Sequence, residues 1–132
     1  MILIVGGAFQ GKKKAAMEIT GLTEKEILDG SSCLFEEIYS AKGICHFHEY
    51  IKRMLEEEID TQGFLNRVYE ENPQIVLIST ELGYGVVPMQ AFDRKYRELT
   101  GRICCEAAQK ADGVYRVVAG IPVCIKGEHT CR

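Results

Sequence analysis

Short apolar runs recur along the chain, and most are followed by a segment whose apolar residues have helical spacing. Runs of four to six residues with little polar interruption are typical of strands buried in a sheet. We predict strands at residues 2–5, 43–47, 74–79, 114–119 and 123–126. The run at 74–79 is typical of a strand covered on both faces.

The segments between these runs carry the helical pattern. We predict helices at residues 12–20, 22–29, 48–59, 62–71 and 90–110. The helix at 22–29 would begin at Thr23, with Glu26 three residues later completing a capping box. Segment 33–39 fits either a short strand or a turn of helix. Alternating strands and helices predict an α/β fold with a mainly parallel sheet and helices on both faces.

The turn after the first strand is rich in glycine and lysine. Gly6, four intervening residues, Gly11 and Lys12 give most of the phosphate-binding pattern G-x-x-x-x-G-K-[ST], between a strand-like and a helix-like segment. Glycines let successive backbone amides point into one concavity, and the helix adds the positive end of its dipole. We expect phosphate contacts from this loop, whose six candidate residues are Gly6, Gly7, Ala8, Gly11, Lys12 and Lys13. The alternative is a glycine-rich strand-to-helix turn with solvated lysines.

Three segments should meet at one edge of the sheet. In parallel α/β sheets, ligands bind beyond the carboxyl ends of the strands. The topology therefore places the loop 6–13, His46 and the segment 80–88 along the same edge.

Length and charge narrow the range of functions. The 132 residues are enough for one domain, which we take to be a single P-loop-type nucleotide-binding domain over 1–132. The net charge of −3 argues against non-specific nucleic-acid binding. No apolar run approaches membrane-spanning length or a signal-peptide core, so we expect a cytoplasmic protein. The six cysteines form no C-x-x-C pair, and we expect them to be free and mostly buried thiols.

Several segments resemble one enzyme family. GGAFQGKK follows the first strand, and STELGYGVVP, RKYRELTGRI and ADGVYRVVAGIPVCIK follow in order over about residues 75–126. Together they resemble the bifunctional adenosylcobinamide kinase/adenosylcobinamide-phosphate guanylyltransferase of cobalamin synthesis. The resemblance implies a P-loop NTPase-like three-layer fold with a C-terminal hairpin. It also implies a homotrimeric enzyme that uses GTP or ATP, phosphorylates adenosylcobinamide and then transfers GMP to it through a guanylyl-histidine.

Three departures from the family pattern affect chemical positions. Lys13 occupies the place of the hydroxyl that holds Mg²⁺, and an ammonium cannot ligate a cation. His46 stands where the family has a metal-organising carboxylate on the second strand. The chain is also shorter between the first helix and this strand, where the family carries its guanylylated histidine. Phosphoryl transfer depends on positioning and on charge neutralisation by metal and lysine. We therefore expect weak Mg²⁺ dependence and a transfer activity that is reduced or lost.

The alternative is a non-catalytic nucleotide- or corrinoid-binding protein with a sensing or assembly role. We assign no catalytic residue and no metal ligand. His46 and His48, as alternate residues of a strand, would share a face and could bind a metal, but one packed and one solvated ring is the favoured interpretation. In the resemblance, Glu81 contacts nucleotide or corrinoid; equally, it could cap backbone amides of the glycine-rich segment that follows.

Overall fold

The computed structural model of the protein describes residues 1–8, 10–82 and 90–127. Six strands form one sheet in the order β2-β3-β4-β1-β5-β6. All neighbouring strands pair in parallel except β5 and β6, which form an antiparallel hairpin. The strands are β1 (Ile2–Gly6), β2 (Ile27–Asp29), β3 (Gly43–Cys45), β4 (Val76–Thr80), β5 (Gly113–Val118) and β6 (Ile121–Lys126).

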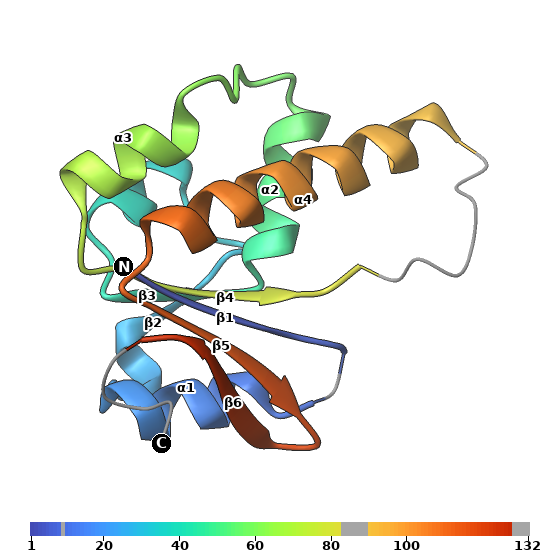
Figure 1. The fold of residues 1–132 in the computed structure, drawn as a ribbon. Coiled ribbons are helices and arrows are strands. Elements are labelled where there is room, and N and C mark those ends of the chain that lie inside the picture. Colours follow the sequence, from blue (N-terminus) through green and yellow to red (C-terminus); the bar gives the residue numbers. More distant parts are fainter. Residues whose placement is uncertain (9, 83–89, 128–132) are drawn as a thin grey trace.

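Helices cover both faces of the sheet (Figure 1). The helix α1 (Lys12–Thr20) lies on one face, and α2 (Phe47–Glu56), α3 (Phe64–Glu71) and α4 (Ala91–Lys110) lie on the other. Two short 3₁₀ helices, Glu24–Glu26 and Phe35–Tyr39, complete the described elements. The three-layer α/β fold with a C-terminal hairpin is therefore confirmed. None of the described helices is long and apolar enough to span a membrane.

The core is divided by the sheet into two clusters. Along β4, Leu77 packs into the larger cluster, while Val76 and Ile78 pack into the smaller cluster that includes residues of α1. All three are buried, as the uninterrupted apolar run predicts. The larger cluster includes stacked aromatic rings, since Tyr50 of α2 stacks against Phe64 of α3. The Tyr50 hydroxyl donates a hydrogen bond to the Phe35 carbonyl oxygen.

One predicted helix is wrong. Residues 22–29 form a 3₁₀ turn followed by strand β2, which pairs in parallel with β3 from Ile27↔Gly43 to Asp29↔Cys45. The predicted capping box is present, because the Thr23 amide donates to Glu26 at 2.9 Å. It caps only three residues, since burial of Ile27 against the sheet outweighs the local helical preference. For segment 33–39, where either a strand or a turn of helix was expected, the structure has a 3₁₀ helix at Phe35–Tyr39.

Other boundaries differ by a few residues. The strand expected at 43–47 ends at Cys45, because His46 adopts a left-handed backbone conformation (φ 52°) that caps α2. The apolar side chains at helical spacing along α4 are buried at Leu99, Ile103 and Ala107. The amino-terminal half of α4 extends past α2 (Figure 1), and there Phe92 and Tyr96 are only partly buried.

The cysteines follow the expectation in part. Cys33 and Cys45 are free and buried, Cys104 is free and partly buried, and Cys105 is free but exposed. Cys124 is disulfide-bonded, which corrects the expectation of free thiols throughout. It is partly buried on the edge strand β6, where it packs against the smaller core cluster.

Candidate functional site

The segment after β1 has the strand–turn–helix geometry that the sequence predicts. β1 ends at Gly6, and α1 begins at Lys12, directly after Gly11. Gly11 adopts a left-handed conformation (φ 76°) and caps the helix, a conformation that glycine adopts at little cost. Phe9 lies outside the described residues. The backbone therefore turns sharply from the central strand into a helix at the carboxyl edge of the sheet.

Gly6 is required by a close approach of two strands. A Cβ atom built on Gly6 would lie 2.6 Å from the backbone oxygen of Val117 on β5. At Gly7 the nearest atom to such a Cβ would be in the Gln10 side chain, at an ordinary 3.6 Å. The two adjacent glycines therefore differ in role: Gly6 allows β1 and β5 to approach each other closely, and Gly7 belongs to the loop.

Lys12 folds back over the loop. Its Nζ donates a hydrogen bond to the Gly7 carbonyl oxygen at 2.8 Å. Burial lowers the pKa of the Lys12 ammonium, while the nearby Glu81 carboxylate opposes that shift. The ammonium thus lies against the backbone of the loop.

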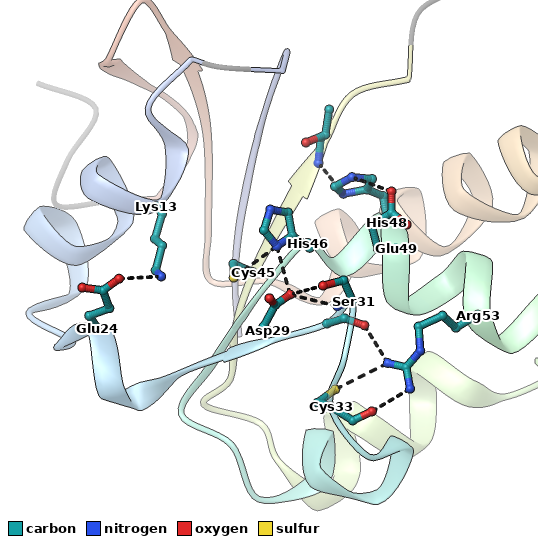
Figure 2. Close-up of polar contacts among 12 residues, drawn as sticks. Lys13, Glu24, Asp29, Ser31, Cys33, Cys45, His46, His48, Glu49 and Arg53 are labelled. Atoms are coloured by element: carbon teal, nitrogen blue, oxygen red, sulfur yellow. Dashed lines mark hydrogen bonds and ion pairs between the residues drawn. The ribbon is translucent and has the colours of Figure 1, made fainter.

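Lys13 points in another direction. Its Nζ forms an ion pair with Glu24 at 3.1 Å, on the side of α1 that faces the 3₁₀ turn before β2 (Figure 2). Lys13 also lines the pocket described below, so its charge contributes to the pocket's field. The position provides no hydroxyl to the loop.

A pocket of about 400 Å³ opens at this edge of the sheet. It is bounded by the loop and the first turn of α1, and by the ends of β3 and β4. The lining residues are Ala8, Gln10, Gly11, Lys12, Lys13, Lys14, Cys45, His46, His48, Ile78 and Thr80. The predicted meeting of the loop, His46 and the start of segment 80–88 is therefore confirmed for the described residues.

Glu81 has a partner that the sequence analysis missed. Its two carboxylate oxygens accept hydrogen bonds from Nε and Nη2 of Arg116 at 3.0 and 3.2 Å. Arg116 projects from β5, and the Glu81 amide donates to the Gly6 carbonyl oxygen at 2.8 Å. The glycine-rich segment that Glu81 was expected to cap lies at 83–89, outside the described residues. A cation on the next strand, 35 residues further along the chain, gives no local sequence signal.

Gln10 is a second residue that sequence reasoning missed. Its side-chain oxygen accepts a hydrogen bond from the Ala119 amide at 2.6 Å, and its backbone oxygen accepts one from the Gly120 amide at 2.8 Å. Ala119 and Gly120 form the turn between β5 and β6. The loop is thus attached to the C-terminal hairpin.

His46 and His48 do not share a strand face, which corrects the expected placement. His46 caps α2, and His48 lies in its first turn. The expectation of one packed and one solvated ring is confirmed, with exposed side-chain fractions of 11% for His48 and 55% for His46. His48 Nδ1 accepts a hydrogen bond from the Thr80 amide at 3.2 Å. Burial lowers the pKa of His48, which agrees with a neutral ring in this role.

Asp29 lies beside His46 at the neighbouring strand end (Figure 2). His46 Nδ1 lies 3.0 Å from Asp29 Oδ1, and the Ser31 hydroxyl and amide donate to the same oxygen at 2.7 and 2.9 Å. These contacts, led by the Ser31 hydroxyl, lower the pKa of Asp29 to about 2. A carboxylate is therefore present at this edge, but from β2 rather than from the strand where the family pattern has one.

The residues present do not fit the Mg²⁺ site of a phosphate-binding loop. Position 13 lacks a hydroxyl. Among the described residues, Glu81 binds Arg116, Glu49 lies 3.7 Å from His48, and Asp29 is on β2, which β3 and β4 separate from β1 and its loop. Mg²⁺ binds through oxygen ligands in near-octahedral geometry, and this edge offers no such set among the described residues.

The central strand, glycine turn, helix and adjoining pocket place the protein in the class of P-loop-type α/β domains. The family model for cobinamide kinase / cobinamide phosphate guanyltransferase matches residues 29–125. Because this match covers well over half of the sequence, the chain belongs to that family. The matched range begins after the loop, so the interpretation of residues 6–13 depends on the pattern and its geometry.

The chain is also similar to curated relatives that are named as proteins of adenosylcobalamin biosynthesis. The chain is 42% identical over 53 residues to the bifunctional adenosylcobalamin biosynthesis protein CobU of Salmonella typhimurium, covering 40% of this chain and 29% of the relative. It is 38% identical over 69 residues to the bifunctional adenosylcobalamin biosynthesis protein CobP of Pseudomonas aeruginosa, covering 52% and 40%. The chain therefore spans less than half the length of these curated relatives.

Proposed function

We propose that this protein binds GTP or ATP through the loop Gly6–Lys13 and acts on the cobinamide branch of cobalamin synthesis, with reduced phosphoryl and guanylyl transfer. One observation carries the proposal: the loop joins the central strand to a helix and borders a pocket with three lysines. Backbone amides at a helix amino terminus, together with lysines, attract phosphate. Membership of the family supports a corrinoid as the acceptor.

The reduction in transfer follows from the residues that replace the usual metal ligands. Lys13 has no oxygen for Mg²⁺, and His46 stands where the family resemblance places a carboxylate. Charge from the lysines can hold phosphates in the ground state, but metal-assisted positioning in the transition state is diminished. Lysines that can hold phosphates, without the usual metal ligands, also support the second candidate, a non-catalytic nucleotide- or corrinoid-binding protein with a sensing or assembly role.

Isothermal titration of GTP and ATP, with and without Mg²⁺, tests the binding proposal. Lys12→Ala should weaken binding about 10- to 100-fold, because it removes a charge-assisted contact worth about 1.5–3 kcal/mol. Lys25→Ala is the matched control: it removes the same charge from an exposed residue that does not line the pocket. Equal affinities in wild type and Lys12→Ala would refute nucleotide binding through the loop.

Two further assays separate the candidate functions. Lys13→Ser restores a hydroxyl and should increase the Mg²⁺ dependence of nucleotide binding; an unchanged dependence would contradict our account of the loop. Turnover of adenosylcobinamide with GTP distinguishes residual transfer from binding alone. Binding without turnover would favour the sensing or assembly role.

A further inference from the structure

Three potential metal ligands meet where β2 and β3 end. Asp29 is the last residue of β2, Cys45 is the last residue of β3, and His46 follows it. The His46 Nδ1 atom lies 3.0 Å from Asp29 Oδ1 and 3.6 Å from Cys45 Sγ. One ligand atom from each residue lies within 4.8 Å of the other two. A carboxylate, a thiol and an imidazole therefore lie close together (Figure 2).

Two of the three separations are close to those of a tetrahedral zinc centre. Zn²⁺ binds sulfur at about 2.3 Å and nitrogen or oxygen at about 2.0–2.2 Å. Tetrahedral geometry then places the ligand atoms about 3.3–3.6 Å from one another. The His46–Cys45 distance of 3.6 Å lies within this range, and the His46–Asp29 distance of 3.0 Å is a few tenths of an ångström below it. The third pair, Asp29 and Cys45, lies within 4.8 Å. Asp29 Oδ1 also accepts the Ser31 hydroxyl and amide, so admitting the ion requires the Asp29 and Cys45 side chains to rotate toward it while Ser31 stays beside the carboxylate.

The backbone around the cluster is held in place. The Gly30 amide donates to the Cys45 carbonyl oxygen at 2.8 Å, and a Cβ on Gly30 would lie only 2.6 Å from the His46 carbonyl oxygen. Arg53 of α2 donates to the carbonyl oxygens of Gly30 and Cys33 at 2.8 and 2.7 Å. The loop that follows Asp29 is therefore fixed against the strand end that carries the other two ligands.

A fourth coordination position would face open space. Cys45 and His46 both line the 400 Å³ pocket, so a water molecule or a ligand in the pocket could complete the shell. The nearby Lys13 ammonium, which would repel a cation, is paired with Glu24. A sulfur, nitrogen and oxygen set with one open position suits Zn²⁺ rather than Mg²⁺.

We propose that Asp29, Cys45 and His46 form a Zn²⁺ site at the carboxyl edge of the sheet, with its fourth position open to the pocket. Binding displaces the thiol proton of Cys45 to solvent, and the His46 ring carries its remaining proton on Nε2. His48 is not part of this set, because its Nδ1 already accepts the Thr80 amide. The site goes beyond the proposed function, since it requires no nucleotide.

The test is metal binding by the full, reduced chain. Zn²⁺ affinity is measured by competition with a chromogenic chelator, and Co²⁺ is added as a spectroscopic substitute. We expect one Zn²⁺ per chain and, with Co²⁺, a near-ultraviolet thiolate-to-metal charge-transfer band with tetrahedral visible absorption. Absence of stoichiometric Zn²⁺ binding overturns the proposal, whatever the nucleotide titrations show.

Variants identify the ligands. Cys45→Ser should abolish the charge-transfer band and weaken Zn²⁺ binding at least about tenfold. His46→Asn should weaken it similarly, and asparagine tolerates the left-handed backbone of this position. Cys33→Ser and Cys105→Ser are matched controls that remove a buried and an exposed free thiol elsewhere, and both should keep the band. A band that survives Cys45→Ser, or wild-type affinity in His46→Asn, would place the ion at another site and overturn the proposal.

Discussion

Replacing Gly6 by alanine tests the packing beneath the loop. The added Cβ would lie 2.6 Å from the Val117 backbone oxygen and 3.3 Å from the Lys12 side chain. The first contact is with backbone of the paired strand β5, so relief requires β1 and β5 to separate locally. Overpacking of this kind costs about 1–3 kcal/mol. We expect the free energy of unfolding to fall by about 2 kcal/mol.

The matched variant is Gly7→Ala at the adjacent residue. There the Cβ meets nothing closer than 3.6 Å, and loss of unfolded-state freedom makes the change neutral or stabilising by up to about 1 kcal/mol. A domain of this size has an unfolding entropy of about 0.28 kcal/mol/K, so Gly6→Ala should lower Tm by about 7 °C. Calorimetry and urea unfolding measure both variants. Equal stability of Gly6→Ala and Gly7→Ala would refute the close approach at Gly6.

Three further changes have expected outcomes. Tyr50→Phe leaves the partly buried Phe35 carbonyl oxygen without its 2.7 Å hydrogen bond from the Tyr50 hydroxyl, and should lower the free energy of unfolding in urea by about 1 kcal/mol; an unchanged midpoint would contradict this. Gln10→Ala removes the side-chain bond to the Ala119 amide, whose hydrogen exchange should accelerate while exchange in β4 does not. The Lys42 ammonium and the Thr23 amide and hydroxyl lower the pKa of Glu26 from 4.5 to about 2. The contribution of Glu26 to the free energy of unfolding is therefore complete above pH 4.5 and is lost as the pH falls towards 2. Glu26→Gln should flatten the pH dependence of stability in that window, and an unaltered slope would contradict the assignment.

The sequence predicted those parts of the fold in which one local signal dominates. The run at 74–79 has apolar residues on both faces and became the buried strand β4. The glycine spacing from Gly6 to Gly11 predicted a strand-to-helix turn. Gly11 adopts the left-handed backbone conformation with which this turn enters α1. At 22–29 a correct local signal, the capping box, led to a wrong helix, because pairing of Ile27 with β3 is not visible locally.

The site could be predicted only where its residues belong to one motif. The loop residues are consecutive, so their placement followed from the sequence. The Glu81–Arg116 pair spans 35 residues and the Asp29–His46 pair spans 17, and both depend on strand order rather than on spacing. His46 and His48 were misplaced for a related reason: the strand ends one residue before His46, where the backbone turns left-handed to begin α2.

The attachment of Gln10 to the turn between β5 and β6 has a thermodynamic consequence. A ligand that reshapes the loop must either move the hairpin turn with it or break two hydrogen bonds. The hairpin's outer strand carries Ile121, Val123 and Ile125, which are 66%, 51% and 60% exposed. Binding of such a ligand to the loop and binding of a partner to β6 would then be linked equilibria. Each would change the free energy of the other by the same coupling free energy. A probe on β6, remote from the phosphate-binding pattern, would therefore respond to any ligand that reshapes the loop.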